Sequence, residues 1–284
     1  MTQGWIDLHC HLLPGVDDGA PDLPSALELA RQLVDQGVDR VAATVHLLDG
    51  RTPQGFTPDQ IAGKRQYLQE ELNRAAIPLT VLPGSEVWLT PAFLRPSGPE
   101  RIYLGRGSGG PLSPAPGAAG LSYLLVEFDL YQEEPPAFLD EVLFELSVSG
   151  VVPVIAHPER YAAVRRHPGR VDQWLEKGAV LQINAGSLLG HGGPQAQALA
   201  IDWLAAGKIH LLASDAHHPQ TRSVRLAEAV EAAAAVVGQA GALRLVRENP
   251  QLLLEGRELL PALAPSAGGV KVARKVKKGK RFLQ

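Results

Sequence analysis

The chain has 284 residues, of which 45% are hydrophobic, enough for one large α/β barrel domain or two small domains. Its single cysteine, Cys10, excludes a disulfide framework and favours a reducing cytoplasm. The sequence shows no cleavable signal and no apolar stretch near the roughly 18 residues that a bilayer span needs, so we expect a cytoplasmic protein.

The net charge of −3 is unevenly distributed along the chain. Residues 270–284 carry seven basic side chains and no acidic one, which leaves 20 basic and 30 acidic residues in the first 269. An acidic body argues against nucleic acid as a partner. Residues 259–284 are predicted to be a disordered tail, and contact with an anionic membrane surface or an acidic partner is the alternative.

Seven short apolar runs recur along the chain, and each is followed by a residue that commonly binds metal or phosphate. The runs with their following residues are Trp5–Leu8 with His9 and His11, Val41–Val45 with His46, Leu79–Leu82 with Glu86, Tyr123–Val126 with Glu127, Val152–Ala156 with His157, Val180–Ile183 with Asn184, and Ile209–Ala213 with Asp215 and His217. Parallel strands of a barrel or open sheet end on one face, where such folds place their chemistry. We therefore expect these polar side chains to converge on one pocket.

Helical patterns separate the apolar runs. They cover residues 24–36, 58–76, 136–149, 168–177, 195–206, 222–237 and 241–247. Seven strand-then-helix units in succession predict a parallel sheet with right-handed crossovers. We expect an α/β fold closed into a distorted (βα)7 barrel over residues 1–258, with an open doubly wound sheet as the alternative.

Residues 95–120 interrupt this alternation. The segment is rich in Gly, Pro and Ser and has no periodicity, which predicts an irregular loop. Because it follows the strand that carries Glu86, it should begin on the same side as the pocket. It could act as a lid, and a plain surface insertion is an equal alternative.

The motif Asp7-Leu8-His9-Cys10-His11 is the sharpest local signal. Side chains alternate along a strand, so Asp7, His9 and His11 should face one side and Leu8 and Cys10 the other. Two imidazoles about 7 Å apart along a strand can bind one divalent ion, and Asp7 could support one of them.

The other candidate ligands are single residues at strand ends. Asp18 lies in a Pro/Gly loop from which its carboxylate can reach the strand ends. Glu86 could bridge two closely spaced ions, which an imidazole cannot do. Glu127 lies inside a hydrophobic strand, where a carboxylate is rare unless it is paired or bound to metal. His46, His157, Asp215 and His217 complete a set of nine candidate metal ligands.

Two arginines complete the predicted site. Arg160 follows His157 by three residues and Arg222 follows His217 by five, and both could bind phosphate oxygens bidentately. Nitrogen and oxygen ligands without thiolates suit Mn, Fe or Zn, and nine ligands suffice for three ions. Closely spaced divalent ions generate hydroxide near neutral pH and stabilise phosphoryl transfer, so the set indicates phosphate ester hydrolysis.

The segments DLHCHLLPGVDDGA, ATVH, GSEVWLT, LLVEF, PVIAHPERY, QINAGSLLG and ASDAH, in this order, resemble the PHP (polymerase and histidinol phosphatase) superfamily. More narrowly, they resemble the bacterial tyrosine-protein phosphatases of the capsule and exopolysaccharide type, from residue 4 to about 256. The resemblance implies a barrel of the PHP type with a trinuclear centre, often of manganese. The implied substrate is the phosphotyrosyl tail of a bacterial tyrosine kinase that controls polysaccharide export.

The resemblance also implies how the ligands divide among three ions. One ion would use His9, His11, Glu86 and Asp215; the second would share Glu86 and add Glu127 and His157; the third would use Asp18, His46 and His217. A metal-activated hydroxide would attack phosphorus, with Arg160 and Arg222 steadying the phosphate. Leu47 and Leu48 depart from the polar residues that relatives often have there. A small-molecule phosphatase such as a histidinol phosphatase, and a non-catalytic kinase-docking module, are the competing functions.

Overall fold

The computed structural model describes residues 4–47, 55–94, 101–109 and 120–260. The predicted strands form one seven-stranded parallel sheet in chain order: β1 (Trp5–Cys10), β2 (Val38–Leu47), β3 (Thr80–Trp88), β6 (Ser122–Glu127), β7 (Val151–Ala156), β8 (Val180–Asn184) and β9 (Leu211–Ala213). The end of β9 returns to β1, because the amide of His11 donates to the carbonyl of Ala216 at 2.9 Å and that of Asp215 to the carbonyl of His9 at 2.8 Å. The sheet is therefore a nearly closed barrel and not the open alternative.

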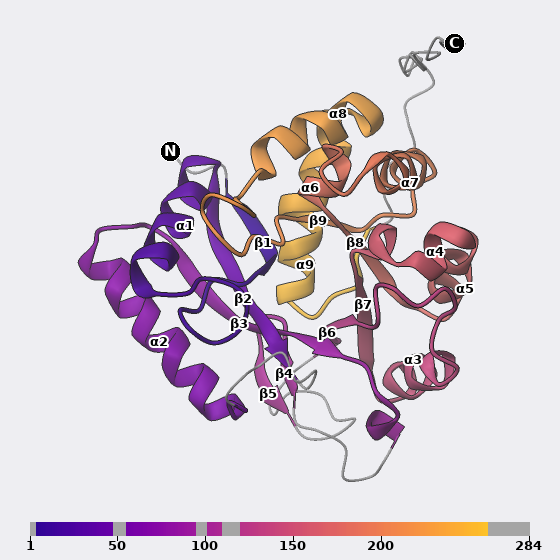
Figure 1. Cartoon of the computed structure of the whole chain (residues 1–284), viewed down its shortest axis with the longest axis horizontal. Helices are drawn as coiled ribbons and strands as arrows, with labels where there is room; N and C mark the ends of the chain where they lie inside the picture. The colour runs from indigo at the N-terminus through magenta and orange to yellow at the C-terminus, as the bar shows by residue number, and fades with distance from the viewer. Residues whose placement is uncertain (1–3, 48–54, 95–100, 110–119, 261–284) are drawn as a thin grey trace, which may run out of the picture.

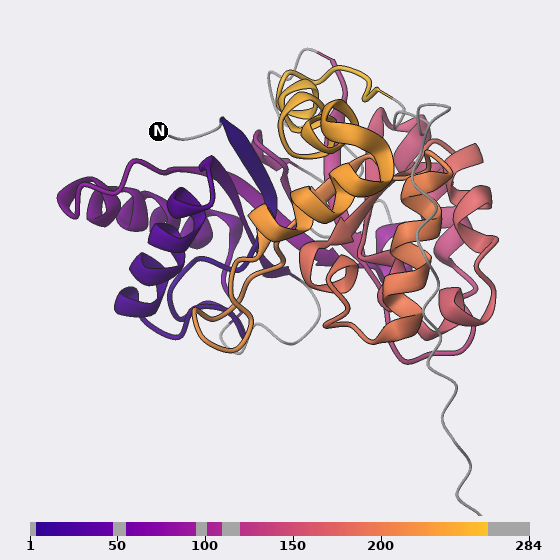
Figure 2. The same ribbon diagram turned by 90° about the horizontal axis from the view of Figure 1, so that it is seen from above.

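Helices lie around the outside of this barrel and, in one case, at one of its ends. They are α1 (Leu23–Asp35), α2 (Pro58–Arg74), α3 (Leu139–Val148), α4 (Ala162–Arg166), α5 (Arg170–Glu176), α6 (Ala185–Leu188), α7 (Pro194–Ala205), α8 (Leu226–Leu243) and α9 (Asn249–Leu254), with 3-10 turns η1 (Pro91–Leu94) and η2 (Pro158–Arg160) and a π-helical turn η3 (Arg244–Glu248). The turned view in Figure 2 shows the N-terminal helices on one side, the magenta and orange helices on the other, and the orange-yellow C-terminal helices between them.

Local sequence explains where the first two helices begin. The side chain of Asp22 accepts a hydrogen bond from the amide of Ser25 and caps α1. Thr57 and Gln60 form a reciprocal capping box at the start of α2. Such caps satisfy amide groups that have no partner within the helix, and each contributes about 1 kcal/mol.

Apolar side chains form two clusters, one outside and one inside the barrel. The outer cluster packs the strands against the helices, with Leu29, Leu33, Leu143 and Trp174 among its buried members. The inner cluster contains residues from the strands of the barrel and from α9, which closes one end. Its members include Leu8, Ala42, Leu125, Val154, Val180, Leu211 and Leu253, and Leu82 of β3 packs against them. Figure 1 shows α9 in the middle of the ring of labelled strands. This packing leaves the carboxyl ends of the strands for polar groups.

The segment 95–120 is not simply an irregular loop. Its strands β4 (Arg101–Tyr103) and β5 (Gly107–Gly109) pair as an antiparallel hairpin, and Tyr103 is fully buried. Leu104 joins the inner cluster, and its amide donates to the carbonyl of Tyr123 at 2.9 Å. The described part of this segment therefore contributes to the core, while residues 95–100 and 110–119 lie outside the described residues.

The expectation that no apolar stretch is long enough for a membrane span is wrong. The helical stretch Leu226–Leu254 passes that test by length and composition. Within it, Gly238 has a φ of 76°, which breaks the regular helix, and Val230, Val246 and Leu253 are buried in the domain. This stretch thus forms part of the packed barrel.

Candidate metal centre

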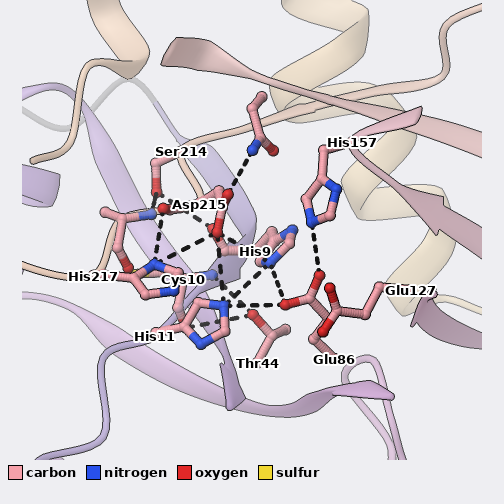
Figure 3. A network of polar contacts seen from close by, with 12 residues as sticks. His9, Cys10, His11, Thr44, Glu86, Glu127, His157, Ser214, Asp215 and His217 are labelled. Atoms are coloured by element: carbon pink, nitrogen blue, oxygen red, sulfur yellow. Dashed lines mark hydrogen bonds and ion pairs between the residues drawn. The ribbon is translucent and has the colours of Figure 1, made fainter. Parts of the chain in front are cut away.

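The nine candidate ligands meet at the carboxyl end of the barrel, where Figure 3 shows most of their side chains. Strand register brings them to a similar level, because His46 pairs with Glu86 across β2 and β3, and Trp88 pairs with Glu127 across β3 and β6. The side chains of all nine except Asp18 are buried, and that of Asp18 is 54% exposed. The structure thus brings these residues together from distant parts of the chain, as predicted.

Glu86 lies at the centre of the cluster. Its Oε2 is 3.2 Å from Nε2 of His9, 3.3 Å from Nε2 of His11 and 3.3 Å from Nδ1 of His46. Its Oε1 is 2.9 Å from Nε2 of His157. One carboxylate therefore contacts four imidazoles from three other strands or their ends, and Figure 3 labels three of them, His9, His11 and His157.

Three further carboxylates surround this centre. Oδ1 of Asp215 is 3.4 Å from Nε2 of His9, on the β9 side. Oδ1 of Asp18 is 3.3 Å from Nε2 of His46 and 3.4 Å from Nε2 of His217. The third carboxylate, Glu127, lies beside His46, with 2.9 Å between its Oε1 and Nδ1 of the imidazole.

These distances fit a metal site. Ligand atoms bound at about 2.0–2.2 Å to one ion lie about 3 to 3.6 Å from one another, as most of these pairs do. Four sets of three or four donor atoms lie within 4.8 Å of one another: His11, Asp18, His46 and His217; His9, His157 and Asp215; His9, His11 and Glu86; and His46, Glu86 and Glu127. Imidazoles and carboxylates together suit divalent ions of the Mn, Fe and Zn type. The residues present therefore fit a multinuclear metal centre.

The electrostatics of the cluster favour cations. Burial alone disfavours the charged form of His9, but Glu86 and Asp215 outweigh it and raise the pKa of His9 to about 9. Burial likewise opposes ionisation of Asp215, yet His9, Arg222 and other cations hold its pKa well below the usual range. His157 has the opposite balance, since burial lowers its pKa to about 4 and leaves a neutral imidazole that can bind metal.

The first strand departs from strict alternation. The register between β1 and β2 shifts between Asp7 and Cys10, and Leu8 packs inside the barrel although it was expected to face away from the ligands. His9 and His11 still meet, with 3.3 Å between their Nε2 atoms. Oδ1 of Asp7 accepts hydrogen bonds from the amides of His9 and Ser214, so Asp7 fixes the two strand ends and not an imidazole ring.

Two residues that orient the imidazoles were missed in the sequence. Nδ1 of His11 donates to Oδ2 of Asp17 at 2.7 Å, and Nδ1 of His9 contacts Oε1 of Gln182 at 2.8 Å. Such partners fix the tautomer that presents Nε2 to an ion. The sequence does contain a signal for each of these two residues. Asp17 is a second carboxylate directly beside Asp18, and Gln182 lies two residues before Asn184 on β8.

Exchange of Asp17 for asparagine tests this role. Oδ2 of Asp17 accepts from His11 and from the amide of His46, while Oδ1 accepts from the amide of Gly19, so in either amide orientation a donor would face a donor. We expect a loss of metal affinity or activity of about 10- to 100-fold. Metal titration of Asp17→Asn beside Asp39→Asn, a control at a half-buried carboxylate of β2 that pairs with Arg40 away from the cluster, checks this. Equal affinities in both variants would contradict the role.

Arg160 and Arg222 lie at the edge of the cluster. Nη1 of Arg160 and Nη2 of Arg222 donate to Oδ2 of Asp215 at 2.9 and 2.8 Å. Their side chains are 31% and 41% exposed, and they line a cavity of about 460 Å³ above the carboxylates. His157 and Asp215 both have positive φ angles, 35° and 51°, which few non-glycine residues adopt.

A parallel barrel with buried imidazoles and carboxylates at its carboxyl end is the architecture of a metal-dependent hydrolase. The family profile described as capsular polysaccharide synthesis, CpsB/CapC, matches residues 5–103 and 113–255. The chain belongs to this CpsB/CapC family, as the resemblance in the sequence indicated.

Individual relatives agree with this assignment. Tyrosine-protein phosphatase YwqE of Bacillus subtilis (strain 168) is 34% identical over 255 residues, covering 90% of this chain and 91% of that protein. Tyrosine-protein phosphatase CpsB of Streptococcus agalactiae serotype V is 27% identical and covers 88% and 98% of the two chains. A chain from the crystal structures of Bacillus subtilis YwqE and Streptococcus pneumoniae CpsB, described as metal-dependent tyrosine phosphatases, has a TM-score of 0.76 at 31% identity and covers 92% of this chain and 99% of its own.

Proposed function

We propose that this chain is a metal-dependent tyrosine-protein phosphatase that serves capsular or exopolysaccharide synthesis. The proposal rests on the cluster of nine imidazoles and carboxylates, all buried except Asp18, beneath a cavity edged by Arg160 and Arg222. Family membership and the names of the relatives support the reaction class. The proposed substrate is the phosphotyrosyl tail of a bacterial tyrosine kinase.

The donor set supports three divalent ions, with Mn first and Fe or Zn as alternatives. Glu86 would be shared, since its two oxygens face different imidazoles. Bound divalent ions would lower the pKa of water toward neutrality and neutralise charge on the phosphate oxygens. The contact between Glu127 and His46 favours an ion held by these two residues with Glu86, in place of the grouping of Glu127 with His157.

The two arginines would bind and orient the phosphate. Asp215 holds both guanidinium groups through Oδ2, and the amide of the Asn184 side chain donates to the same oxygen at 2.5 Å. The arginine donors that Asp215 does not use are therefore fixed in position before substrate arrives. Preorganised donors of this kind stabilise the charge that develops on a transferring phosphoryl group.

Replacement of Arg160 by alanine tests this role. We expect kcat/KM on a phosphotyrosyl peptide to fall about 10²- to 10³-fold while the metal content stays unchanged, because the guanidinium contacts phosphate and is not a ligand. Arg166→Ala is the control, since the Arg166 side chain is 55% exposed and pairs with Glu133. Loss of metal from Arg160→Ala, or unchanged activity, would contradict the assignment.

The rim of the cavity favours an aromatic substrate. Trp88, Leu130 and Tyr131 line it, and Tyr131 is 86% exposed. Two hydrogen bonds hold the loop that carries Tyr131. The amide of Tyr131 donates to Oδ1 of Asp129 at 2.8 Å, and the amide of Ala162 donates to the carbonyl of Leu130 at 2.9 Å. An exposed aromatic side chain on a fixed loop suits stacking on the ring of phosphotyrosine.

A substrate panel separates the proposed function from its alternatives. Phosphotyrosyl peptide, phosphoseryl peptide and histidinol phosphate would be compared at equal concentration with Mn²⁺ present. We expect the phosphotyrosyl peptide to have the highest kcat/KM. Preference for histidinol phosphate would favour the small-molecule phosphatase, and kinase binding without any hydrolysis would favour the docking module.

Several predictions from the sequence lie beyond what the described residues test. Residues 261–284 of the predicted tail (259–284) and Leu48 lie outside them, whereas Leu259 packs against the inner cluster and Leu47 is buried at the end of β2. The cytoplasm remains the proposed compartment, and the free, buried Cys10 is compatible with it. The boundary of the barrel near residue 258 likewise stays a prediction.

A further inference from the structure

A second cavity lies against the candidate metal centre. It has a volume of about 300 Å³, and Arg160, Asp215 and Arg222 line it as well as the first cavity. Its lining also includes Arg225, Thr221 and polar or small residues of the segment after β8. The two arginines of the proposed phosphate site therefore border both cavities.

The second cavity is positively charged. Arg160, Arg222 and Arg225 line it, and among the described residues its only acidic lining residue is Asp215. Oδ2 of Asp215 already accepts from Arg160, Arg222 and Asn184. The partner of Arg225 is Glu228, at 3.8 Å with a side chain 65% exposed, and such an exposed pair contributes little. Arg225 is thus available to a second anion.

The backbone around Arg225 is held on both sides. Nε2 of Gln36 donates to the carbonyl of Val224 at 2.6 Å, and Oε1 of the same side chain accepts from the amide of Ala227 at 3.0 Å. The amide of His217 donates to the carbonyl of Arg222 at 3.0 Å. The segment that carries both arginines is therefore anchored to α1 and to the metal centre.

Arg225 also occupies an unfavourable position for helix stability. It is the N-cap residue of α8, makes no capping hydrogen bond, and places a cation at the positive end of the regular helix that runs from Leu226 to the break at Gly238. Asp, Asn, Ser or Thr would stabilise that position better. The arginine and the helix end instead add their positive potentials on the side of the cavity.

We propose that this second cavity is a subsite for a carboxylate side chain that neighbours the phosphotyrosine in the substrate peptide. The inference rests on the proposed phosphatase function. An extended peptide advances about 3.3 Å per residue, so an acidic residue next to the phosphotyrosine can reach a cavity that shares two lining arginines with the first. Arg225 then acts as a specificity residue that does not contact the reacting phosphate.

Paired peptides test the subsite. Two sets of phosphotyrosyl peptides would differ only by Glu or Gln, placed before the phosphotyrosine in one set and after it in the other. In at least one set we expect the Glu peptide to have a KM about fivefold lower, with Mn²⁺ present. Arg225→Gln should abolish this difference while kinetics on the Gln peptide and metal content stay unchanged.

A matched control exists on α1. Arg31 pairs with Glu28 at 3.4 Å, three residues apart, as Arg225 does with Glu228, and its side chain is 50% exposed. Arg31→Gln should keep the preference for the Glu peptide. Equal KM values for the peptides with the wild-type chain, or a preference that survives Arg225→Gln, would overturn the proposal.

Binding of non-hydrolysable phosphonate versions of the same peptides separates this test from the proposed function. Tighter binding of the Glu version that depends on Arg225 would support the subsite even if no peptide were hydrolysed. Hydrolysis of every peptide without discrimination in either assay would leave the phosphatase function intact and reject the subsite.

Discussion

His9→Ala should abolish phosphatase activity and remove metal at the same time. Nε2 of His9 lies within 3.4 Å of donor atoms from His11, Glu86 and Asp215, so its loss removes a donor from the middle of the proposed centre. Bound ions contribute several kcal/mol to such reactions, so we expect activity to fall by about 10³-fold or more. Elemental analysis should show at least one ion fewer per chain.

The control separates chemistry from folding. His167→Ala removes an imidazole whose side chain is 51% exposed and pairs with Glu134 outside the cluster, and it should keep both metal and activity. Because His9 is fully buried, circular dichroism of His9→Ala must show that the barrel still folds. A folded His9→Ala variant with full activity and full metal content would show that the site is wrongly assigned.

Glu86→Gln is expected to be almost as damaging, although the side chain keeps its size. The change removes a negative charge that four imidazoles face, and it replaces one acceptor oxygen by an amide donor. A neutral amide cannot bridge two cations as a carboxylate does. We expect loss of at least one ion and a fall in kcat of about 10³-fold, measured with metal-saturated protein.

The same change on the surface provides the comparison. Glu70 lies on α2 with a side chain 50% exposed, so Glu70→Gln should leave metal content and kcat unchanged. If Glu86→Gln bound the same number of ions as the wild-type chain and turned over at the same rate, the central role of Glu86 would be rejected. A variant that kept its ions but lost activity would limit that role to catalysis.

The barrel could be predicted because its signals are local. Each strand is a short apolar run that ends in a polar residue, and Gly37, Gly150, Gly178 and Gly207 all follow helices and have positive φ angles. Parallel strands then bring their ends together whatever the intervening sequence. This is why nine residues separated by up to 208 positions could be proposed as one cluster from the sequence alone.

Features that depend on contacts between distant segments could not be predicted. The pairing of Gln182 with His9 crosses 173 residues, and neither residue type by itself indicates it. The hairpin of β4 and β5 has strands of only three residues, and β5 (Gly-Ser-Gly) has the composition of a loop. The placement of Glu127 beside His46 likewise depends on barrel curvature, which no sequence pattern encodes.

The most direct test is phosphate release from a phosphotyrosyl peptide by protein stripped of metal and then restored with Mn²⁺, alongside elemental analysis of the protein as purified. We predict no activity without metal, recovery with Mn²⁺, and about two to three ions per chain, as for a multinuclear centre. Undiminished hydrolysis by fully stripped protein, or failure of the protein to bind any divalent ion, would contradict the account.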